Sequence, residues 1–465
     1  MKKRMKTSGK WLRIIRMAVF AGLASVISLS CSNKFEGKII AVQLDDLPGQ
    51  LNGAQLVLLD PGRNETKVRF LLGDFESSAS PSLSHEGRYL YFQGKQNEGD
   101  PWQIWVLDLK KGAVNRVSDV PENCTQPAAL PDGSVVFSRE EKVRGTKVHN
   151  LWKCMMDGCC LTQITHTPAR NLYPNVLLEG RILYASQQVY PELREPQLMI
   201  MRPDGTKSEL YSPGNDELHP ASGGIDSPDG YIYFISSGGQ LSRVLHRRPL
   251  HTFENLSKDL DGSFTSVFPL GDSTCLVSYL PADGSSFGLY RYDPRDQETP
   301  EALFQGEKHL VDPLMIARLD PRPRILPSPV DPNKPTAILM VQDIGHSSIP
   351  KQEGIQGDSL ASYIRFSTLE GELGVVEAKE DGSVYVKLDA NTPFIMETLN
   401  KQGEVIQGPS DWIYLRPNER RACTGCHVNL ELAPRNYQPH AVKEDPVILT
   451  SLGEGTSNKR GGGSK

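Results

Sequence analysis

The residues best suited to chemistry lie near the C-terminus, in the run Cys423-Thr424-Gly425-Cys426-His427. This C-x-x-C-H pattern is typical of covalent attachment of c-type haem. Two thiols at this spacing can add to the vinyl groups on one edge of a porphyrin, and the adjacent imidazole is then placed to bind the iron. We therefore predict one covalent haem c, tethered by Cys423 and Cys426, with His427 as an axial iron ligand.

Two other interpretations of the motif stay open. Cys423 and Cys426 could form a disulfide, or they could supply half of a zinc site. Zinc requires a second pair of ligands at suitable spacing, and the adjacent Cys159 and Cys160 do not have that spacing. The haem interpretation is favoured over both.

The motif does not settle the sixth iron ligand. His440 follows His427 by 13 residues in a Pro-rich run, and His346 follows a predicted strand. Met340 and Met396 are further candidates, although Met in a strand is more often core filler, and the iron could also lack a sixth protein ligand. Two His ligands would suit electron transfer, whereas an open iron would bind a small molecule.

Residues just before the motif are candidates for contact with the porphyrin. Trp412 could pack against the ring and Arg420 could pair with a propionate, although each could equally be an ordinary surface residue. The chain contains no Gly-rich phosphate loop, nucleophile elbow or H-E-x-x-H sequence, and these are the motifs that would mark other catalytic chemistry. No catalytic residue is predicted.

The part of the chain that must position this motif contains a sequence repeat of 45 to 50 residues. Strands end at Asp60, Asp108, Asp157 and Asp204, which are 48, 49 and 47 residues apart, and a second hairpin marked by a turn Gly alternates with them. Two hairpins per repeat make four strands, which is one propeller blade. We predict an all-β chain with a propeller of about six blades between residues 40 and 304.

The period is lost from about residue 324. Short strands at 337–341, 374–377, 383–388 and 394–399, separated by Gly turns, predict a small antiparallel sandwich that carries the haem segment. The predicted divisions are a signal peptide (1–30), a linker (31–39), the propeller (40–323), the haem-bearing module (324–450) and a disordered Gly-, Ser- and Lys-rich tail (451–465).

The N-terminal segment predicts export. Its first 30 residues hold seven basic residues and no acidic one, and the apolar stretch 17–29 is as long as a signal-peptide core and short for a membrane-spanning helix. The stretch ends at Cys31 and resembles a bacterial lipoprotein signal, with Cys31 lipidated; ordinary secretory cleavage and an uncleaved anchor are the alternatives. Ser32 favours the outer membrane, so we expect a lipid-anchored protein of the cell envelope that faces the periplasm or the surface.

The rest of the chain is acidic. Beyond residue 30 there are 44 basic and 56 acidic residues, a formal net charge of −12. Nucleic acid requires a cationic face to neutralise its phosphates, so nucleic acid is not expected as a partner.

Residues 372–434 resemble the haem-bearing module of the hydrazine synthase alpha subunit family, in which the module accompanies TolB-like propellers. The resemblance rests on Gly374, Val376 and Glu377, on Asp381-Gly382-Ser383 and Ala390-Asn391-Thr392-Pro393, and on the run from Pro417 through His427. The repeats themselves resemble the WD40-like repeats of TolB-type propellers. The family implies covalent haem c held by Cys423 and Cys426 with His427 at the iron.

The same resemblance has limits. The family's enzyme works in a multi-subunit complex with more than one haem per alpha chain, whereas this chain has one C-x-x-C-H, and the first Tyr after His427 is Tyr437. The haem module is therefore expected here without the synthesis of hydrazine.

Three functions follow as hypotheses. The favoured one is an exported, lipid-anchored monohaem cytochrome that transfers electrons to a redox partner protein. The second is a haem c oxidoreductase acting on a small nitrogen or oxygen compound at an open iron. The third is a non-redox binding protein that uses its propeller. Whether the chain is an enzyme stays open, with electron transfer preferred.

Five cysteines remain outside these assignments, namely Cys124, Cys154, Cys159, Cys160 and Cys275. Because five is odd, at least one thiol stays free or bonds another chain. Cys154 and Cys159 flank the predicted turn at Asp157-Gly158 and are the favoured pair, with metal binding as a minor alternative. The scattered histidines of the propeller are expected to be solvated.

Overall fold

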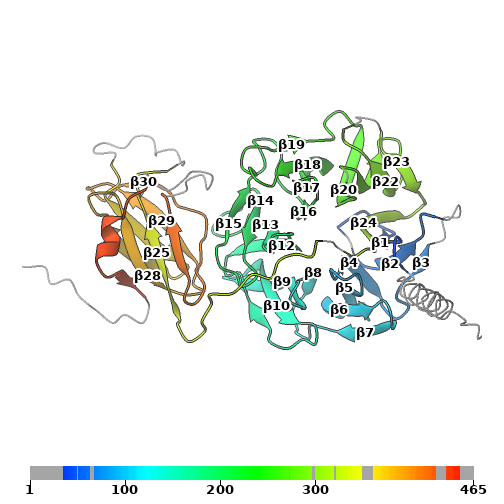
Figure 1. Ribbon diagram of the computed structural model, residues 1–465, viewed down its shortest axis with the longest axis horizontal. Coiled ribbons are helices and arrows are strands. Elements are labelled where there is room, and N and C mark those ends of the chain that lie inside the picture. The colour runs from blue at the N-terminus through cyan, green and yellow to red at the C-terminus, as the bar shows by residue number, and fades with distance from the viewer. Residues whose placement is uncertain are drawn as a thin grey trace, which may run out of the picture.

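The computed structural model describes residues 35–49, 51–62, 68–271, 273–295, 299–318, 321–347, 360–425 and 436–450. They form a propeller and, beside its fourth blade, a smaller β-sandwich (Figure 1). The predicted all-β fold with a propeller and a sandwich-like module is confirmed. The predicted signal peptide, Cys31 and the C-terminal tail lie outside the described residues. Within the described ranges, no helix combines the length and the apolar character needed to cross a bilayer.

The described strands of the propeller form six blades of four strands each, and a parallel pairing of β10 with β12 joins the third and fourth blades into one eight-stranded sheet. The first two are β24 (His309–Met315), β1 (Ile39–Leu44), β2 (Gln55–Leu59) and β3 (Arg69–Phe70), then β4 (Ser77–Leu83), β5 (Tyr89–Lys95), β6 (Gln103–Asp108) and β7 (Ala113–Arg116). The next two are β8 (Cys124–Ala129), β9 (Ser134–Val143), β10 (Thr146–Met155) and β11 (Thr162–Gln163), then β12 (Ala169–Val176), β13 (Ile182–Gln188), β14 (Gln197–Met201) and β15 (Glu209–Ser212). The last two are β16 (Ile225–Asp226), β17 (Tyr231–Ser236), η1 (Ser237–Gly239), β18 (Gln240–Leu245) and β19 (Glu254–Asn255), then β20 (Gly262–Pro269), β21 (Cys275–Pro281), β22 (Gly288–Tyr292) and β23 (Glu301–Phe304).

The ring closes through a strand from the far end of the propeller sequence. Strand β24 pairs antiparallel with β1, with Ile39 opposite Met315 and Leu44 opposite His309. The first blade therefore takes its innermost strand from β24 and its other three strands from the N-terminal side. Closure of this kind protects strand edges that would otherwise remain unpaired.

The turns between the strands explain why the repeat is visible in the sequence. Gly205, in the turn between β14 and β15, has φ +83, a left-handed backbone conformation that Gly adopts without steric cost. A Cβ atom at this position would lie 2.1 Å from the carbonyl oxygen of Ile164 in the third blade. Glycine is thus required both for the turn and for close approach of the third and fourth blades.

The sandwich consists of two four-stranded sheets. One sheet has the order β31 (Arg420–Cys423), β25 (Thr336–Val341), β28 (Val384–Asp389) and β32 (Val447–Leu449), and the other has β27 (Gly371–Glu377), β26 (Tyr363–Thr368), β29 (Phe394–Leu399) and β30 (Val405–Gln407). A short helix, η2 (His440–Lys443), precedes β32. Apolar side chains from both sheets form one buried core that includes Leu339, Val341, Phe366, Val386 and Phe394.

The expectation of an antiparallel sandwich is correct for most pairs and wrong for two. Strand β31 runs parallel to β25, and β32 runs parallel to β28. A parallel pair cannot be joined by a tight hairpin and requires a long crossover. The chain from β25 to β31 and the chain from β28 to β32 both pass through strands of the second sheet, so the pairing joins segments far apart in the sequence.

Candidate haem-attachment site

Strand β31 carries the first residue of the C-x-x-C-H motif to one edge of the sandwich. Its parallel register with β25 places Arg420 opposite Ile338 and Cys423 opposite Val341, where both strands end. The backbone N–H of Gln342 donates a hydrogen bond of 2.8 Å to the carbonyl of Cys423. The start of the motif is therefore held by a sheet. Cys426 and His427 lie outside the described residues.

Cys423 occupies the boundary between the sandwich core and solvent. Its side chain is partly buried and packs against the apolar core of the module. Burial raises the pKa of the thiol, so the group is uncharged near neutral pH. An uncharged, partly exposed thiol beside apolar side chains is compatible with the apolar edge of a porphyrin.

Both histidines proposed as the sixth ligand lie at the end of the sandwich where β31 ends. Because β25 and β31 are parallel, the chain leaves β25 beside Cys423, and His346 follows within five residues of the end of the strand. The backbone N–H of His346 donates to the carbonyl of Asp343 at 3.2 Å, and its side chain is partly exposed. The N–H of Ile344 donates to the carbonyl of Gly382 at 2.9 Å, which ties this segment to the turn before β28.

His440 is attached to that same turn. Its backbone N–H donates to a carboxylate oxygen of Asp381 at 2.8 Å, and the N–H of Ala441 donates to Ser383 Oγ at 2.9 Å. Burial opposes ionisation of Asp381, but hydrogen bonds from Ser383 and from the backbone of His440 hold its pKa below the ordinary value. The His440 side chain is exposed.

These contacts bring Cys423, His346 and His440 to one end of the sandwich. Strand order β31-β25-β28, with Val341 opposite both Cys423 and Val384, aligns the end of the motif strand with the turn that holds His440. In the described part of the chain, no group of three or more His, Cys, Asp or Glu side chains is arranged to bind a metal ion by itself. Cys and His are the residue types that hold haem c.

The segment before the motif is anchored to the propeller. The indole N–H of Trp412 donates to the carbonyl of Tyr190 at 2.8 Å, and Arg194 forms an ion pair of 2.6 Å with Asp411. Trp412 is thus engaged by the propeller, and its proposed contact with haem stays a prediction. Arg420 is exposed on β31, and its predicted pairing with a propionate likewise stays a prediction.

Tyr414 lies at the centre of this interface. It is 2% exposed, and its hydroxyl lies 3.0 Å from the carbonyl oxygen of Ile164 and 3.1 Å from that of Gly205. One hydroxyl proton serves two acceptors that belong to the third and fourth blades. The aromatic ring of Tyr414 also packs edge-on against that of His166, with centroids 5.5 Å apart.

Arg416 adds a polar contact beside Tyr414. Its guanidinium donates to the carbonyl of Asp204 at 3.0 Å, to Nε2 of His166 at 2.5 Å and to Asn391 Oδ1 at 2.7 Å. Since a guanidinium only donates, His166 Nε2 must be unprotonated to accept. Burial and the charge of Arg416 lower the pKa of His166 to about 3, which agrees with this tautomer.

Glu419 and Arg421 continue the interface up to the motif strand. Glu419 is buried and accepts a 2.9 Å hydrogen bond from the backbone N–H of Lys207, while Arg421 pairs with Glu419 at 2.9 Å and donates to the carbonyl of Ser208 at 3.1 Å. The sequence did not predict this interface. Its only signal was a run of aromatic and charged residues without strand periodicity at 411–421.

The remaining cysteines are arranged differently from the sequence expectation. Cys124, Cys154 and Cys275 are buried, and Cys154 does not pair with Cys159. Instead, Cys159 and Cys160 are exposed, with their Sγ atoms 3.2 Å apart. The favoured Cys154–Cys159 pair is therefore not formed, because the Cys154 side chain points into the blade core.

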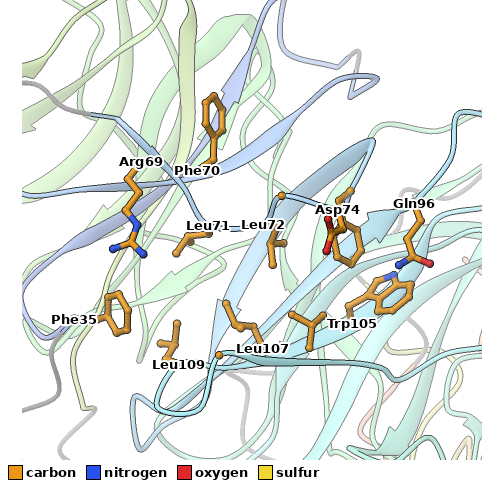
Figure 2. A pocket seen from close by; sticks show the side chains of 14 residues that line it. Phe35, Arg69, Phe70, Leu71, Leu72, Asp74, Gln96, Trp105, Leu107 and Leu109 are labelled. Atoms are coloured by element: carbon orange, nitrogen blue, oxygen red, sulfur yellow. The ribbon is translucent and has the colours of Figure 1, made fainter.

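A cavity of about 470 Å³ lies on the side of the propeller, between the first and second blades (Figure 2). Its lining mixes apolar side chains such as Leu71 and Trp105 with the polar side chains of Arg69, Asp74 and Gln96, and it contains neither Cys nor His. It is distinct from the haem-attachment edge and offers no ligand for iron.

Comparisons with known proteins agree with this arrangement. Residues 340–428 match the family model of the hydrazine synthase alpha subunit middle domain. The chain is 21% identical to the hydrazine synthase subunit alpha of Kuenenia stuttgartiensis, and the match covers 81% of this chain and 62% of that protein. The chain therefore spans about three fifths of the length of this relative.

One solved structure has the same fold. The hydrazine synthase of Kuenenia stuttgartiensis superimposes with a TM-score of 0.75 at 17% identity, covering 88% of this chain and 71% of that chain. TolB from Acinetobacter baumannii matches with a TM-score of 0.40 at 15% identity, covering 67% and 74%.

Proposed function

Since the chain belongs to a hydrazine synthase alpha-like family with a propeller fold, we propose that it is an exported c-type cytochrome. It carries one covalent haem in the sandwich and transfers single electrons to a redox partner protein. The observation that supports this most directly is the placement of Cys423, His346 and His440 at one end of the sandwich, which results from the parallel pairing of β31 with β25 and from the hydrogen bond of His440 to Asp381.

Each residue has a defined part in this proposal. Cys423 and Cys426 would tether the porphyrin, and His427 would bind the iron. His440 is the proposed sixth ligand, because its side chain is exposed while its backbone is held by Asp381. The haem supplies one-electron oxidation and reduction when it is bound, and a bis-His iron stays closed to other ligands.

The interface at residues 411–421 gives the haem edge a fixed position relative to the propeller. Tyr414 and Arg416 hold the module on the third and fourth blades, and the motif strand begins four residues after Arg416. Electron transfer benefits from a fixed geometry, because reorganisation of the site raises the barrier. We propose that the propeller acts as the rigid support.

The location and partners complete the proposal. Lipidation at Cys31 would anchor the protein to the outer membrane, and the redox partner would approach the edge of the sandwich that carries the motif. Nucleic acid is not proposed as a partner, because the chain beyond residue 30 has an excess of acidic residues.

A second candidate function rests on the family itself. The named relative is a hydrazine synthase, and hydrazine is a small nitrogen compound. If neither His440 nor His346 binds the iron, the open position would suit an oxidoreductase acting on a small nitrogen or oxygen compound. Hydrazine synthesis is not proposed, because this chain has one C-x-x-C-H motif. Without covalent haem, the remaining candidate is a non-redox binding protein built on the propeller.

Expression of the whole chain in a host with c-type maturation machinery tests these proposals. We expect haem to stay on the chain in a denaturing gel, and we expect C423S/C426S to lose it while C160S, an exposed cysteine far from the motif in sequence, keeps it. Low-spin optical bands that do not respond to carbon monoxide support electron transfer, and a high-spin iron that binds carbon monoxide supports the second candidate. Two unmodified thiols at 423 and 426 by mass spectrometry would refute both haem proposals.

A further inference from the structure

A second centre of cysteine chemistry lies on the third blade, just after the turn that joins β10 to β11. Cys159 and Cys160 are both exposed, and their Sγ atoms are 3.2 Å apart. The other cysteines described in the propeller, Cys124, Cys154 and Cys275, are 0%, 3% and 0% exposed. A reagent in solution therefore reaches these two adjacent thiols and not the buried ones.

The backbone holds the two thiols together. The N–H of Cys159 donates to Asp157 Oδ1 at 3.0 Å, and its carbonyl accepts from the N–H of Met155 at 3.0 Å. Thr162 Oγ1 donates to the carbonyl of Cys160 at 3.0 Å. Cys160 adopts φ +62, a left-handed conformation that is uncommon for a residue with a side chain. The chain thus accepts local strain at the position that brings the sulfurs into contact.

The preceding turn cannot move away easily. Gly158 has φ +82, and a Cβ atom there would lie 2.6 Å from the carbonyl oxygen of Val117 in the segment after β7. The turn therefore packs directly against the backbone of the second blade. Because this turn is held in place, the two thiols stay in contact and the segment that carries them has few other conformations.

We propose that Cys159 and Cys160 form a reversible dithiol–disulfide pair, a redox modification site on the propeller. The oxidant is an external disulfide, R–S–S–R. One thiolate attacks a sulfur of R–S–S–R and releases R–SH, and the second thiolate then attacks the mixed disulfide and releases another R–SH. Two electrons pass from the pair to the external disulfide, and the two protons of the pair end on the two released thiols.

The disulfide formed in this way is expected to be easily reduced. Consecutive Cα atoms across a trans peptide are about 3.8 Å apart, whereas an ordinary disulfide joins Cα atoms separated by about 4.4–6.8 Å. The shorter Cα–Cα separation strains the ring that a disulfide between adjacent residues closes. Strained, exposed disulfides have higher, more oxidising reduction potentials.

The test uses the folded, full-length chain treated with either dithiothreitol or excess oxidised glutathione, followed by iodoacetamide without denaturant and peptide mapping. After reduction we expect both residues to be alkylated. After oxidation we expect alkylation of both to fall at least tenfold, with a peptide that has lost two hydrogens and carries no glutathione. Added dithiothreitol should restore alkylation.

Single variants separate this pair from other arrangements. C159S and C160S should each stop at a stable glutathione adduct on the remaining thiol, because no neighbour can displace it. C154A should still form the pair. Thermal unfolding checks that each variant is folded. Two stable glutathione adducts at 159 and 160, a link between Cys154 and Cys159, or full alkylation after oxidation would each overturn the proposal.

Discussion

His166 provides the sharpest test of the interface between the propeller and the sandwich. Its Nε2 accepts a hydrogen bond from Arg416, and burial together with that cation lowers its pKa to about 3. In the unfolded chain a His titrates near its ordinary value of about 6.5. Below that value His166 binds a proton in the unfolded state but not in the native state. The free energy of unfolding therefore falls as the pH drops from about 6.5 towards about 3.

The size of the effect follows from the two pKa values. Between about pH 8 and about pH 5, linkage gives a loss of about 2 kcal/mol for a ring moved from about 6.5 to about 3. Partial contact of His166 with solvent reduces this towards about 1 kcal/mol. H166Q keeps an acceptor for Arg416 but does not titrate, so the variant should lack this part of the pH dependence.

The assay is urea unfolding of the wild type and H166Q over this pH range, followed by Trp fluorescence. The difference between the two free energies of unfolding isolates His166 from the carboxylates. H246Q is the control with the opposite sign. The Glu179 carboxylate, 3.8 Å from Nε2 of His246, raises the pKa of His246, so its contribution is present at low pH and disappears as the pH rises through the native pKa. Equal pH slopes for the wild type and H166Q would refute the buried neutral His and the interface built on it.

Three further predictions use other parts of the structure. Y414F removes the hydroxyl shared by the carbonyls of Ile164 and Gly205. The variant should lower the free energy of unfolding, measured in urea, by about 1–3 kcal/mol. An unchanged value would mean that the hydroxyl is not buried between the blades. G205A should destabilise the chain by several kcal/mol more than G230A in thermal unfolding. Both glycines have positive φ, but only a Cβ at position 205 would meet a neighbouring backbone, at 2.1 Å. Similar losses of stability in the two variants would contradict the close approach of the blades. In the haem-loaded chain, H440A should convert a low-spin spectrum to high-spin while H346A leaves it low-spin; the reverse result would assign the sixth position to His346.

Much of the propeller could be predicted because its signals are local. The turn glycines and the alternation of polar and apolar residues specify hairpins over a few residues, and their recurrence predicts blades. Strand β24 was not anticipated, because its pairing with β1 joins residues 39–44 to residues 309–315. No local pattern specifies a pairing at that separation.

The haem-attachment edge was predicted in part. The motif and both histidines were named from the sequence, but nothing in their spacing indicated that β31 would lie parallel to β25 or that Asp381 would hold His440. Tyr414 and Arg416 were missed as interface residues, since their partners lie some 200 to 250 residues earlier in the chain. The contact between Cys159 and Cys160 depends on the side-chain directions at a left-handed residue, which composition does not indicate.

The amino-acid sequence by itself determined the blade repeat, the all-β class and the C-x-x-C-H motif, because turn conformation, strand alternation and ligand spacing are properties of short segments. Only the tertiary structure decided how the ring closes, which edge of the sandwich receives the motif, and which blades hold the module. Those choices depend on packing and hydrogen bonding between segments far apart in the chain, and that free energy exists only when the whole fold has formed.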